Sequence, residues 1–572
     1  MASIVKKIKK GRPYYYAVQS QRVNGKPRIT WQKYLGTIAA IVERADAARP
    51  PRPKETVIFE AGGVAALLRI AQRLGVLELI NAVVPKRRQG PTVGHYMVLA
   101  ALNRALAPRS KVEIGPWYEG TALRRLWGFD KSAFSSQRFW DHMDRLSPKA
   151  IDDIQDQLVP RIEKTFGLDS GLLLYDTTNF FTFLATANER SRLARRGHSK
   201  QKRHDLRQIG LALLVADDFQ IPLFHQTYPG DVPDVSLFPQ LGRQLLARYR
   251  KAIRPTANQK HIQATLVFDK GNVSDEAMET LVVEGTPFVA ALAANRCPDL
   301  LATPLEQLQT LADLPGCRAA TATETFWGTT CRAVVVYTES FFTQQLHGVT
   351  QNLVRCQKKL LDHSRTLDKW RAGKLRGKKP TVASVRKNVR RILAPQFIKD
   401  LITVKIEPDP STAIPRLTYR VNHDALGRLT DQRLGRTVLI TNRLDSDAAT
   451  VVRTYRQLTA IEDTFKAMKN VDFLRWQPGW HWTDQKLRVH AFYCVLALTL
   501  ASLARKIAFQ AAVDLSLHGL LAELAAIREV AVIYPPGTLA HRKDHITLTR
   551  MTPRQRKLAQ ALQIGEILHH EG

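Results

Sequence analysis

The spacing of apolar and polar residues changes several times along the chain, and each change predicts a different kind of element. Near the amino terminus, aromatic and β-branched runs flank Asn24-Gly25, a dipeptide typical of hairpin turns. Three prolines between positions 48 and 55 then interrupt the pattern. From about residue 56 to 165, apolar residues recur at helical spacing. We therefore expect a basic N-terminal β module at residues 1–47 and a helical region at 56–165.

Strand-like runs replace the helical pattern from about residue 171. Three of them, "GLLLYDTT", "QIGLALLVADD" and "QIPLFHQTYPG", are close enough in sequence to form a meander. A helical segment, a fourth strand at "ATLVFDKG", a second helical segment and a fifth strand at "PFVAALAA" follow. This order predicts a mixed sheet of the α/β class. We place the first part of this core at residues 166–300.

A strongly basic region interrupts the core before its pattern returns. Residues 351–400 contain 15 Lys or Arg against three Asp, and strand-like runs flank them. A strand, "GRTVLITN", and a long helix that begins near Asp447 come next, and helices are expected to continue to the end. The remainder is accordingly divided into a basic insertion domain of mixed α/β structure at 301–435, the second part of the core at 436–510, and a C-terminal helical region at 511–572.

The charge balance indicates a polyanionic partner. The chain has 85 Lys and Arg against 51 Asp and Glu, which gives a formal net charge of +34. Such an excess is self-repelling unless DNA, RNA or another polyanion neutralises it. A ribosomal or otherwise generally cationic protein is the alternative. The helical region 56–165 and the N-terminal module are our candidates for recognising DNA.

The cysteines and the apolar segments restrict the class of protein further. Five scattered cysteines without a CxxC pair argue against a disulfide framework and a zinc ribbon, and they fit a reducing compartment. No apolar stretch of the secretory kind follows the basic amino terminus. The most apolar segment, residues 489–504, is shorter than a membrane span and contains His490, so we interpret it as a buried helix. We expect a soluble intracellular protein that uses no membrane. The sequence contains no P-loop, so no nucleotide cofactor is expected.

Three acidic residues occupy positions that a sheet would bring together. Asp176 ends the first predicted strand and Asp269 ends the fourth, each directly after an apolar run. Sites in open α/β sheets usually lie at such strand ends. Glu462 lies in the predicted helix near the boundary of its apolar face. The apolar positions of this helix are Leu458, Ile461, Phe465 and Met468.

Carboxylates without a His or Cys cluster favour Mg²⁺ or Mn²⁺ over zinc. Two such ions about 4 Å apart can activate a water or hydroxyl and stabilise the leaving oxygen of a phosphodiester. The alternative is that each acid caps a turn or pairs with a lysine, because strand-terminal aspartates are common. Charge and spacing leave both interpretations open.

An ordered set of motifs resembles the DDE transposases of bacterial insertion sequences, and in particular the insertion-sequence-four superfamily. The motifs are "LLLYDTTNFF", "GHSKQKRHDLRQIGLALL", "YPGDVPD", "TLVFDKGN", "YRQLTAIEDTFKAMKN" and "FLRWQPGWHWTDQKLRVHAFYCVLAL". The resemblance extends over roughly residues 10 to 505. It implies a ribonuclease-H-like core interrupted by an insertion domain. It also implies that Asp176, Asp269 and Glu462 are the catalytic triad and bind two Mg²⁺ ions, for which Mn²⁺ substitutes.

The same resemblance implies contacts to DNA. Tyr455, Glu462 and Lys469 keep the spacing of a tyrosine–arginine–glutamate–lysine pattern, in which Tyr455 and Lys469 would hold terminal phosphates. The usual arginine position is Leu458 here, and Arg456, on another side of the helix, is an uncertain substitute. This departure affects the arginine's contact and leaves the metal site unchanged.

Basic residues are also concentrated between the first two predicted strands. A solvated charged loop is one interpretation, but the position beside Asp176 favours contacts to substrate phosphates. The residues assigned to DNA here are Lys200, Lys202, Arg203 and Arg207. His198 and His204 do not have a convincing metal-ligand spacing. The basic stretch 351–400 is expected to pack along DNA rather than to fold as an isolated domain, with a solvent-facing helix pair as the alternative. Five tryptophans are interpreted as core residues: Trp327, Trp370, Trp476, Trp480 and Trp482.

Together these observations predict a transposase. As a homodimer, it would bind the terminal inverted repeats of its insertion sequence in double-stranded DNA, cleave the ends by two-metal hydrolysis and join the 3′-hydroxyl ends to target DNA. It would act in the bacterial cytoplasm, associated with the nucleoid. One alternative is a ribonuclease-H-like nuclease that cuts without joining. Another is a non-catalytic DNA-binding regulator derived from a transposase.

Overall fold

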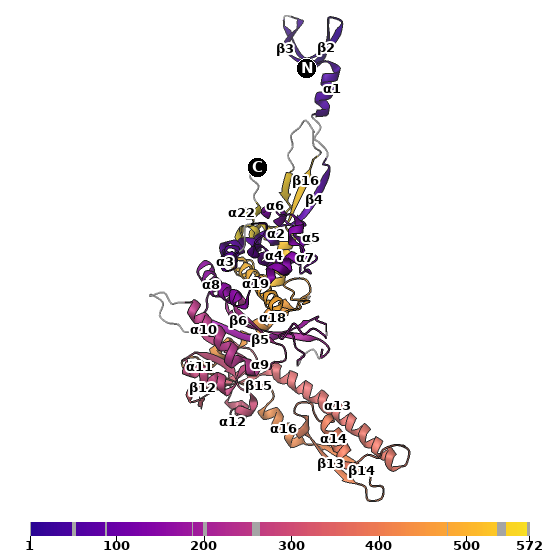
Figure 1. Cartoon of the computed structure of the whole chain (residues 1–572), viewed down its shortest axis with the longest axis vertical. Helices are drawn as coiled ribbons and strands as arrows, with labels where there is room; N and C mark the ends of the chain where they lie inside the picture. The colour runs from indigo at the N-terminus through magenta and orange to yellow at the C-terminus, as the bar shows by residue number, and fades with distance from the viewer. Residues whose placement is uncertain are drawn as a thin grey trace. The chain divides into compact units, whose positions relative to one another are not determined.

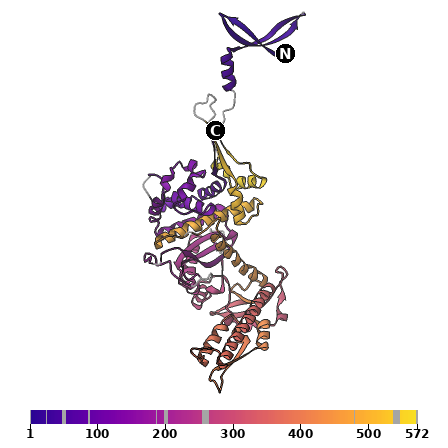
Figure 2. The same cartoon turned by 90° about the vertical axis from the view of Figure 1, so that its right-hand side faces the viewer.

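The computed structural model describes residues 2–23, 25–47, 53–85, 89–185, 187–197, 203–253, 264–477, 479–534 and 545–568. Asn24, His198, Lys200 and Lys202 lie outside these ranges. The chain divides into two compact units. Unit 1 comprises residues 1–69, 115–133 and 507–572, and unit 2 comprises 70–114 and 134–506. Their elements are drawn in Figure 1 and, turned by 90°, in Figure 2.

Unit 1 contains two small antiparallel sheets. The first has the order β1-β2-β3 and consists of β1 (Ala2–Lys9), β2 (Arg12–Val23) and β3 (Lys26–Gly36), with α1 (Ile38–Ala47) following. The second has the order β17-β16-β4 and consists of β4 (Glu55–Glu60), β16 (Arg528–Ile533) and β17 (His545–Leu548). The helices of this unit are α6 (Leu123–Trp127), α20 (Leu517–Ala525), α21 (Pro553–Ala561) and α22 (Ile564–Leu568).

Strands β16 and β17 differ from the prediction that residues 511–572 are helical. β16 pairs along its whole length with β4, from Arg528 opposite Glu60 to Ile533 opposite Glu55. Its partner comes from the other end of the chain, and the strand is short. Local periodicity is a poor guide to such a pairing, because it reports only the residues nearby.

Unit 2 is built on one nine-stranded mixed sheet with the order β10-β11-β12-β15-β9-β8-β5-β6-β7. Its strands are β5 (Leu172–Thr182), β6 (Arg207–Ala216), β7 (Pro222–Pro229), β8 (Thr265–Phe268), β9 (Phe288–Ala291), β10 (Gln309–Thr310), β11 (Cys317–Phe326), β12 (Thr329–Thr338) and β15 (Arg436–Thr441). β5, β6 and β7 form the expected meander, and β8 and β9 run parallel to β5. The prediction of a multidomain α/β protein with a large mixed sheet is confirmed.

Helices flank this sheet in the order that the apolar spacing predicted. α10 (Arg243–Ala252) lies between β7 and β8, and α11 (Asp275–Val283) lies between β8 and β9. α8 (Pro148–Phe166) packs on α10, where Arg248 bridges Asp152 and Asp156 at 2.8 Å each. The other helices of this unit are α3 (Val76–Val83), α4 (Val93–Leu106), α7 (Ser136–Met143), α9 (Asp234–Leu237), α12 (Pro298–Leu301), α17 (Ala448–Arg456), α18 (Leu458–Met468) and α19 (Asp484–Gln510). Most of α2 (Gly62–Arg73) and of α5 (Ile114–Glu119) belongs to unit 1.

The basic insertion folds around an apolar core of its own. Its elements are α13 (Glu339–Arg371), α14 (Val382–Ile392), α15 (Ile398–Leu401), β13 (Ile402–Pro408), β14 (Pro415–Val421) and α16 (His423–Gln432). Buried Val349, Cys356, Leu360 and Leu367 form a stripe along α13 and pack with buried residues of the other elements. Residues 351–400 therefore pack together with the elements that follow them, within unit 2. The expectation that this stretch packs along DNA stays a prediction. The apolar stripe is spread thinly between many basic residues, which concealed it.

Strands β10, β11 and β12 extend the nine-stranded sheet, although they lie within the predicted insertion 301–435. β12 pairs directly with β15, from Arg332 opposite Thr441 to Tyr337 opposite Arg436. The part of the insertion that has its own core therefore begins at α13.

Among the described residues, α19 is the one helix that is long and apolar enough to cross a membrane by length and composition. In the folded chain, 94% of its apolar window is buried. Such burial is typical of a core helix, which is how the sequence was interpreted.

Candidate active site

The register of two parallel strands places Asp176 beside Asp269. On β5 and β8, Leu172 pairs with Thr265 and Leu174 pairs with Val267. Two residues further along each strand direction are Asp176 and Asp269. Neighbouring strands are about 4.8 Å apart, and residues at matching positions point to the same face. The two carboxylates therefore leave the sheet side by side.

Aromatic packing identifies the face from which they leave. Tyr175 and Phe268, the residues before the two aspartates, both pack on Phe238, with ring centroids 4.9 Å and 4.6 Å from it. Because side chains alternate along a strand, Asp176 and Asp269 point to the opposite side of the sheet. We call this side the acid face.

The helix that carries Glu462 packs against β5. The sequence predicted one long helix from Asp447, but the structure divides it at Gln457 into α17 and α18. α17 packs on β8, β9 and β15, whereas α18 packs on β5, so the break lets the chain follow different strands. Tyr455 and Glu462 consequently lie on different helices.

The burial pattern of α18 agrees with its apolar spacing. Glu462 is exposed, next to the buried Ile461. All four apolar positions singled out from the sequence are buried: Leu458, Ile461, Phe465 and Met468. Glu462 therefore lies at the boundary of the packed side of this helix, as predicted.

Tyr455 links the three acids electrostatically. Its hydroxyl donates a hydrogen bond of 2.7 Å to Asp269 Oδ1. Burial raises the pKa of Tyr455 far above its ordinary value of 10.0, and the negative charges of Asp269, Glu462 and Asp176 raise it further. All three carboxylates thus act on the same hydroxyl, although they come from β5, from the end of β8 and from α18.

Lys469, at the C-terminal end of α18, also lies on the acid face. Its Nζ donates a hydrogen bond of 2.8 Å to Thr178 Oγ1 and lies 5.3 Å from the ring centroid of Phe180. Thr178 and Phe180 follow Asp176 by two and four residues on β5, so they share its face. The ammonium group is therefore held close to Asp176.

An aromatic stack supports this arrangement. The rings of Phe180 and Trp476 are parallel to within 12°, with centroids 4.3 Å apart. Trp476 is fully buried, and its backbone N–H donates to Met468 O at the end of α18. Thr178 and this stack were not among the site residues predicted from the sequence. The two-residue alternation from Asp176 is the signal that would have identified Thr178 and Phe180.

The acids are not drawn together around a single point of coordination. Within the described ranges, no group of three His, Cys, Asp or Glu side chains is placed to hold a metal ion. Asp269 Oδ1 instead accepts the hydrogen bond from Tyr455.

The predicted DNA-binding arginines have partners within the protein. Arg203 is paired with Asp205 at 2.7 Å, and both side chains are exposed. Arg207 donates a hydrogen bond of 2.8 Å to Asn188 O. Arg456 donates to the thiol of Cys317 at the start of β11. Lys200 and Lys202 lie outside the described residues.

Asp484, which the sequence analysis did not single out, anchors the ordered part of the basic loop. Its Oδ1 accepts hydrogen bonds from Ser191 Oγ (2.7 Å), Arg192 N (2.9 Å) and Leu193 N (3.0 Å). Asp484 is the first residue of α19, so these bonds tie the loop to the start of a buried helix. An acid in the first turn of a predicted helix was the available signal.

Two of the five tryptophans interpreted as core residues are exposed. Trp480 is 53% exposed and Trp482 is 63% exposed, whereas Trp476 is buried. The backbone O of Trp482 accepts a hydrogen bond of 3.3 Å from Asn188 Nδ2, so this segment borders the basic loop.

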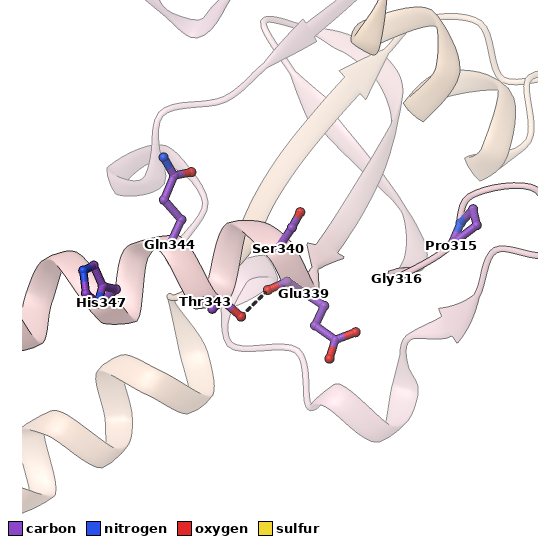
Figure 3. Close-up of a pocket in the computed structure, with 7 residues that line it drawn as sticks. All are labelled: Pro315, Gly316, Glu339, Ser340, Thr343, Gln344 and His347. Atoms are coloured by element: carbon purple, nitrogen blue, oxygen red, sulfur yellow. Dashed lines mark hydrogen bonds between the residues drawn. The ribbon is translucent and has the colours of Figure 1, made fainter.

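A pocket of about 730 Å³ lies where the β10–β11 loop meets the first turns of α13, as Figure 3 shows. Gly316 lies on the loop side, and Glu339 and His347 lie on the helix side. Glu339 N donates to Gly316 O, and Thr343 Oγ1 donates to Glu339 O, each at 3.0 Å. Asp176, Asp269 and Glu462 do not line this pocket.

Comparisons with known proteins add little to this geometry. No family model matches the chain, and no curated protein matches it. Among solved structures, the chain is similar to a piggyBac transposase in a synaptic complex with hairpin DNA. The identity is 11%, the alignment covers 89% of this chain and 85% of that one, and the TM-score is 0.37. A TM-score this low is too weak to assign a function.

Proposed function

We propose that the protein is a DDE transposase. In this proposal it binds the double-stranded terminal inverted repeats of its own element, cleaves the DNA there and joins the 3′-hydroxyl ends to a target. The observation that carries the proposal is the geometry of the acids: the parallel register of β5 and β8 sets Asp176 beside Asp269, and α18, which carries Glu462, packs on β5. The net charge of +34 supports DNA as the substrate, because a polyanion would neutralise it.

The order of the elements supports a ribonuclease-H-like core. In such a core the first acid lies on the first strand, the second follows the fourth strand, and the third lies on a helix beyond an insertion. Here Asp176 is on β5, the first strand of the sheet, and Asp269 follows β8, the fourth. Glu462 is on α18, which comes after the inserted elements α13 to α16.

The donor chemistry of the three acids fits Mg²⁺ or Mn²⁺. Carboxylate oxygens are the ligands that these hard cations prefer, and the three acids come from neighbouring elements, β5, the end of β8 and α18. Asp176, Asp269 and Glu462 would hold the two ions. When bound, the ions would activate a water or hydroxyl and stabilise the leaving oxygen of the phosphodiester. To bind the two ions, the carboxylates would have to move closer together. Asp269 would also have to give up the hydrogen bond that it accepts from Tyr455 and bind an ion instead.

Tyr455 and Lys469 would position the phosphates. The raised pKa keeps the phenol of Tyr455 protonated at neutral pH, so it can donate a hydrogen bond but is a poor nucleophile. Lys469 would exchange its bond to Thr178 for a bond to a phosphate oxygen, a stronger charge-assisted interaction.

A homodimer would hold both ends of the element, because each round of transposition needs two cleaved ends. The basic loop between β5 and β6 would contact backbone phosphates beside the acids, with Arg203 and Arg207 released from their present partners. Such contacts set position and affinity rather than sequence preference. We place the protein in the bacterial cytoplasm, with the nucleoid.

The test is a cleavage and strand-transfer assay on DNA that flanks the gene, with Mg²⁺ or Mn²⁺ against chelator. We expect metal-dependent nicks and joined products from the wild type and none from Asp269→Ala. Asp275→Ala is the matched control, because Asp275 follows closely in sequence but is paired with Arg296 and Trp327. Nicks without joined products would favour the nuclease. Salt-sensitive binding by folded protein without any cleavage would favour the regulator.

A further inference from the structure

The first 36 residues contain nine Lys or Arg and no Asp or Glu. They form the three-stranded sheet β1-β2-β3, which Figures 1 and 2 show with α1 following it. Because the segment contains no acid, none of its lysines and arginines is neutralised by a carboxylate from the same sheet. The sheet is therefore a concentrated positive surface.

The strand register separates this sheet into two faces. Val5 pairs with Tyr16, and Tyr16 pairs with Tyr34, so these residues share what we call the inner face. Ile4 pairs with Ala17, and Ala17 pairs with Lys33, so these residues share the outer face. By alternation along the strands, the outer face also carries Lys6, Ile8, Gln19 and Trp31.

The inner face is occupied by its own side chains. The rings of Tyr14 and Tyr16 lie 6.0 Å and 5.2 Å from the ring of Tyr34. Lys7 lies 4.9 Å above the ring of Tyr16, and Val18 is only 2% exposed. Tyr34, on the edge strand β3, is still 50% exposed, so the small core of the module lies on this face around Val18 and the two tyrosines of β2.

The outer face is uncovered. Ile4 is 66% exposed, Ile8 is 68% exposed and Trp31 is 49% exposed, and Lys6 and Lys33 beside them are exposed as well. Exposed apolar side chains grouped on one side of a sheet mark an interaction surface. Because lysines lie among these apolar side chains, a complementary partner must be negatively charged.

We propose that the outer face docks on double-stranded DNA, with Lys6 and Lys33 on phosphates and with Gln19 and Trp31 directed into the groove. Three strands are about 10 Å wide, which matches the roughly 12 Å of the major groove, where β-sheets are known to read bases. A second copy is a poorer partner, because two outer faces would set Lys6 and Lys33 against like charges. The inference rests on the proposed DNA-binding function and assigns part of it to this face.

Adjacent residues on β2 allow a test by cross-linking. Gln19 and Ser20 are both exposed, and the β2–β3 register shifts between them. Gln19 pairs with Trp31 and Ser20 with Ile29, so the extra residue, Thr30, is on β3, and the two side chains of β2 still point to opposite faces. Gln19→Cys and Ser20→Cys would each be made in the full chain and labelled with a photo-activated cross-linker. The five native cysteines are buried, so background labelling is small. With a labelled duplex as probe, we expect Gln19→Cys to cross-link several-fold more than Ser20→Cys. Equal yields, or the reverse order, would overturn the assignment of the face.

Charge variants give an independent measurement. Lys6→Gln with Lys33→Gln removes two outer-face charges, and Lys9→Gln with Arg12→Gln removes two charges at the β1–β2 turn. For the first pair, the dependence of log affinity on log salt should fall by about 1.8, because each lost phosphate contact contributes about 0.9. The second pair should keep the wild-type slope. An equal fall in both pairs would overturn the proposal.

Other outcomes separate this proposal from the wider one. If the wild-type protein cleaves its DNA but these variants do not differ from one another, only the assignment of the docking face is overturned. Wild-type protein that binds no duplex at all would overturn both proposals. Concentration-dependent self-association that Trp31→Ala abolishes, without any change in duplex binding, would assign the outer face to a second copy. Preferential binding to vesicles of anionic lipid over duplex would also overturn the assignment.

Discussion

The carboxylate of Asp409 and the three carboxylates of the acid face, all in unit 2, lie in contrasting surroundings. Asp409, in the turn between β13 and β14, is buried and accepts hydrogen bonds from its own hairpin. Ser411 donates from Oγ (2.6 Å) and N (3.1 Å), Thr412 from N and Oγ1 (3.1 Å each), and Arg416 from Nε (3.1 Å). The bonds from Ser411 and Thr412, with the Ser411 hydroxyl first, lower the pKa of Asp409 strongly. On the acid face, burial raises the pKa of the Tyr455 hydroxyl most, and the negative charges of three carboxylates from separate elements raise it further.

The difference shows how a structural acid can be distinguished from a candidate functional one. Asp409 is satisfied by donors within seven residues of it, so its role is local: it closes a hairpin. The convergence of Asp176, Asp269 and Glu462 depends instead on strand register and on the packing of α18. Negative charge assembled from distant parts of the chain carries an electrostatic cost, and such an arrangement is typical of a site that binds a cation.

The largest expected effect is on DNA cleavage. Asp176→Asn should lower the rate of metal-dependent cleavage on the order of 10³-fold or more. The substitution removes a negative charge that would bind the ions, and the ions would stabilise the transition state by several kcal/mol. Asp409→Asn should leave the rate per folded molecule unchanged and lower the thermal midpoint. Rates measured with purified variants, with circular dichroism as the folding control, test this contrast. It fails if the two variants lose cleavage equally.

The next effect concerns the packing under the acid face. Trp476→Ala removes the stack on Phe180 and should cost about 3–5 kcal/mol of unfolding free energy in its cooperative unit. Cleavage should also fall in the protein that remains folded, because α18 loses part of its support against β5. Denaturant unfolding and cleavage at a temperature below the transition measure the two losses. A destabilised variant with full activity would show that the acids do not depend on this packing.

A smaller effect is expected at high pH. The folded-state pKa of Tyr455 lies above its unfolded value near 10, so the folded chain keeps this proton as pH rises. Stability contributed by the raised pKa is complete below pH 10 and is lost above it, by up to about 1.4 kcal/mol per pH unit. Tyr455→Phe should lose less stability than the wild type over this range. Parallel losses in the two proteins would show that the carboxylates do not act on this hydroxyl.

The smallest effect has the opposite sign with pH. The lowered pKa of Asp409 contributes stability that is present above the unfolded value of 3.8 and is lost as pH falls through the folded value. The difference in thermal midpoint between wild type and Asp409→Asn should therefore narrow below pH 3.8. Melting curves at neutral and acidic pH provide the measurement. If the difference in thermal midpoint stays constant in acid, the charge of Asp409 does not stabilise the hairpin.

The sequence was informative where local pattern determines structure. The apolar runs before Asp176 and Asp269 indicated strands, and their order indicated the meander and the two parallel strands of a mixed sheet. The spacing around Glu462 identified the buried side of α18. These features depend on alternation and helical periodicity, which neighbouring residues set.

Long-range pairing accounts for most of what the sequence did not reveal. β16 forms because β4 offers an edge, and β10 to β12 join the core sheet through β15. The break at Gln457 follows from packing on different strands, and no proline or glycine marks it. The bonds from Asp484 to the basic loop join residues almost 300 positions apart. No local pattern determines any of these contacts.

Binding of Mn²⁺ to the full chain tests the central claim most directly. Free Mn²⁺ would be followed by electron paramagnetic resonance, with and without a DNA duplex, for the wild type, Asp176→Asn, Asp269→Asn, Glu462→Gln and the control Asp409→Asn. We expect each of the first three variants to weaken binding at least about tenfold and the control to match the wild type. Mn²⁺ binding that none of the three substitutions changes, or that Asp409→Asn weakens as much, would contradict a single site built from β5, β8 and α18.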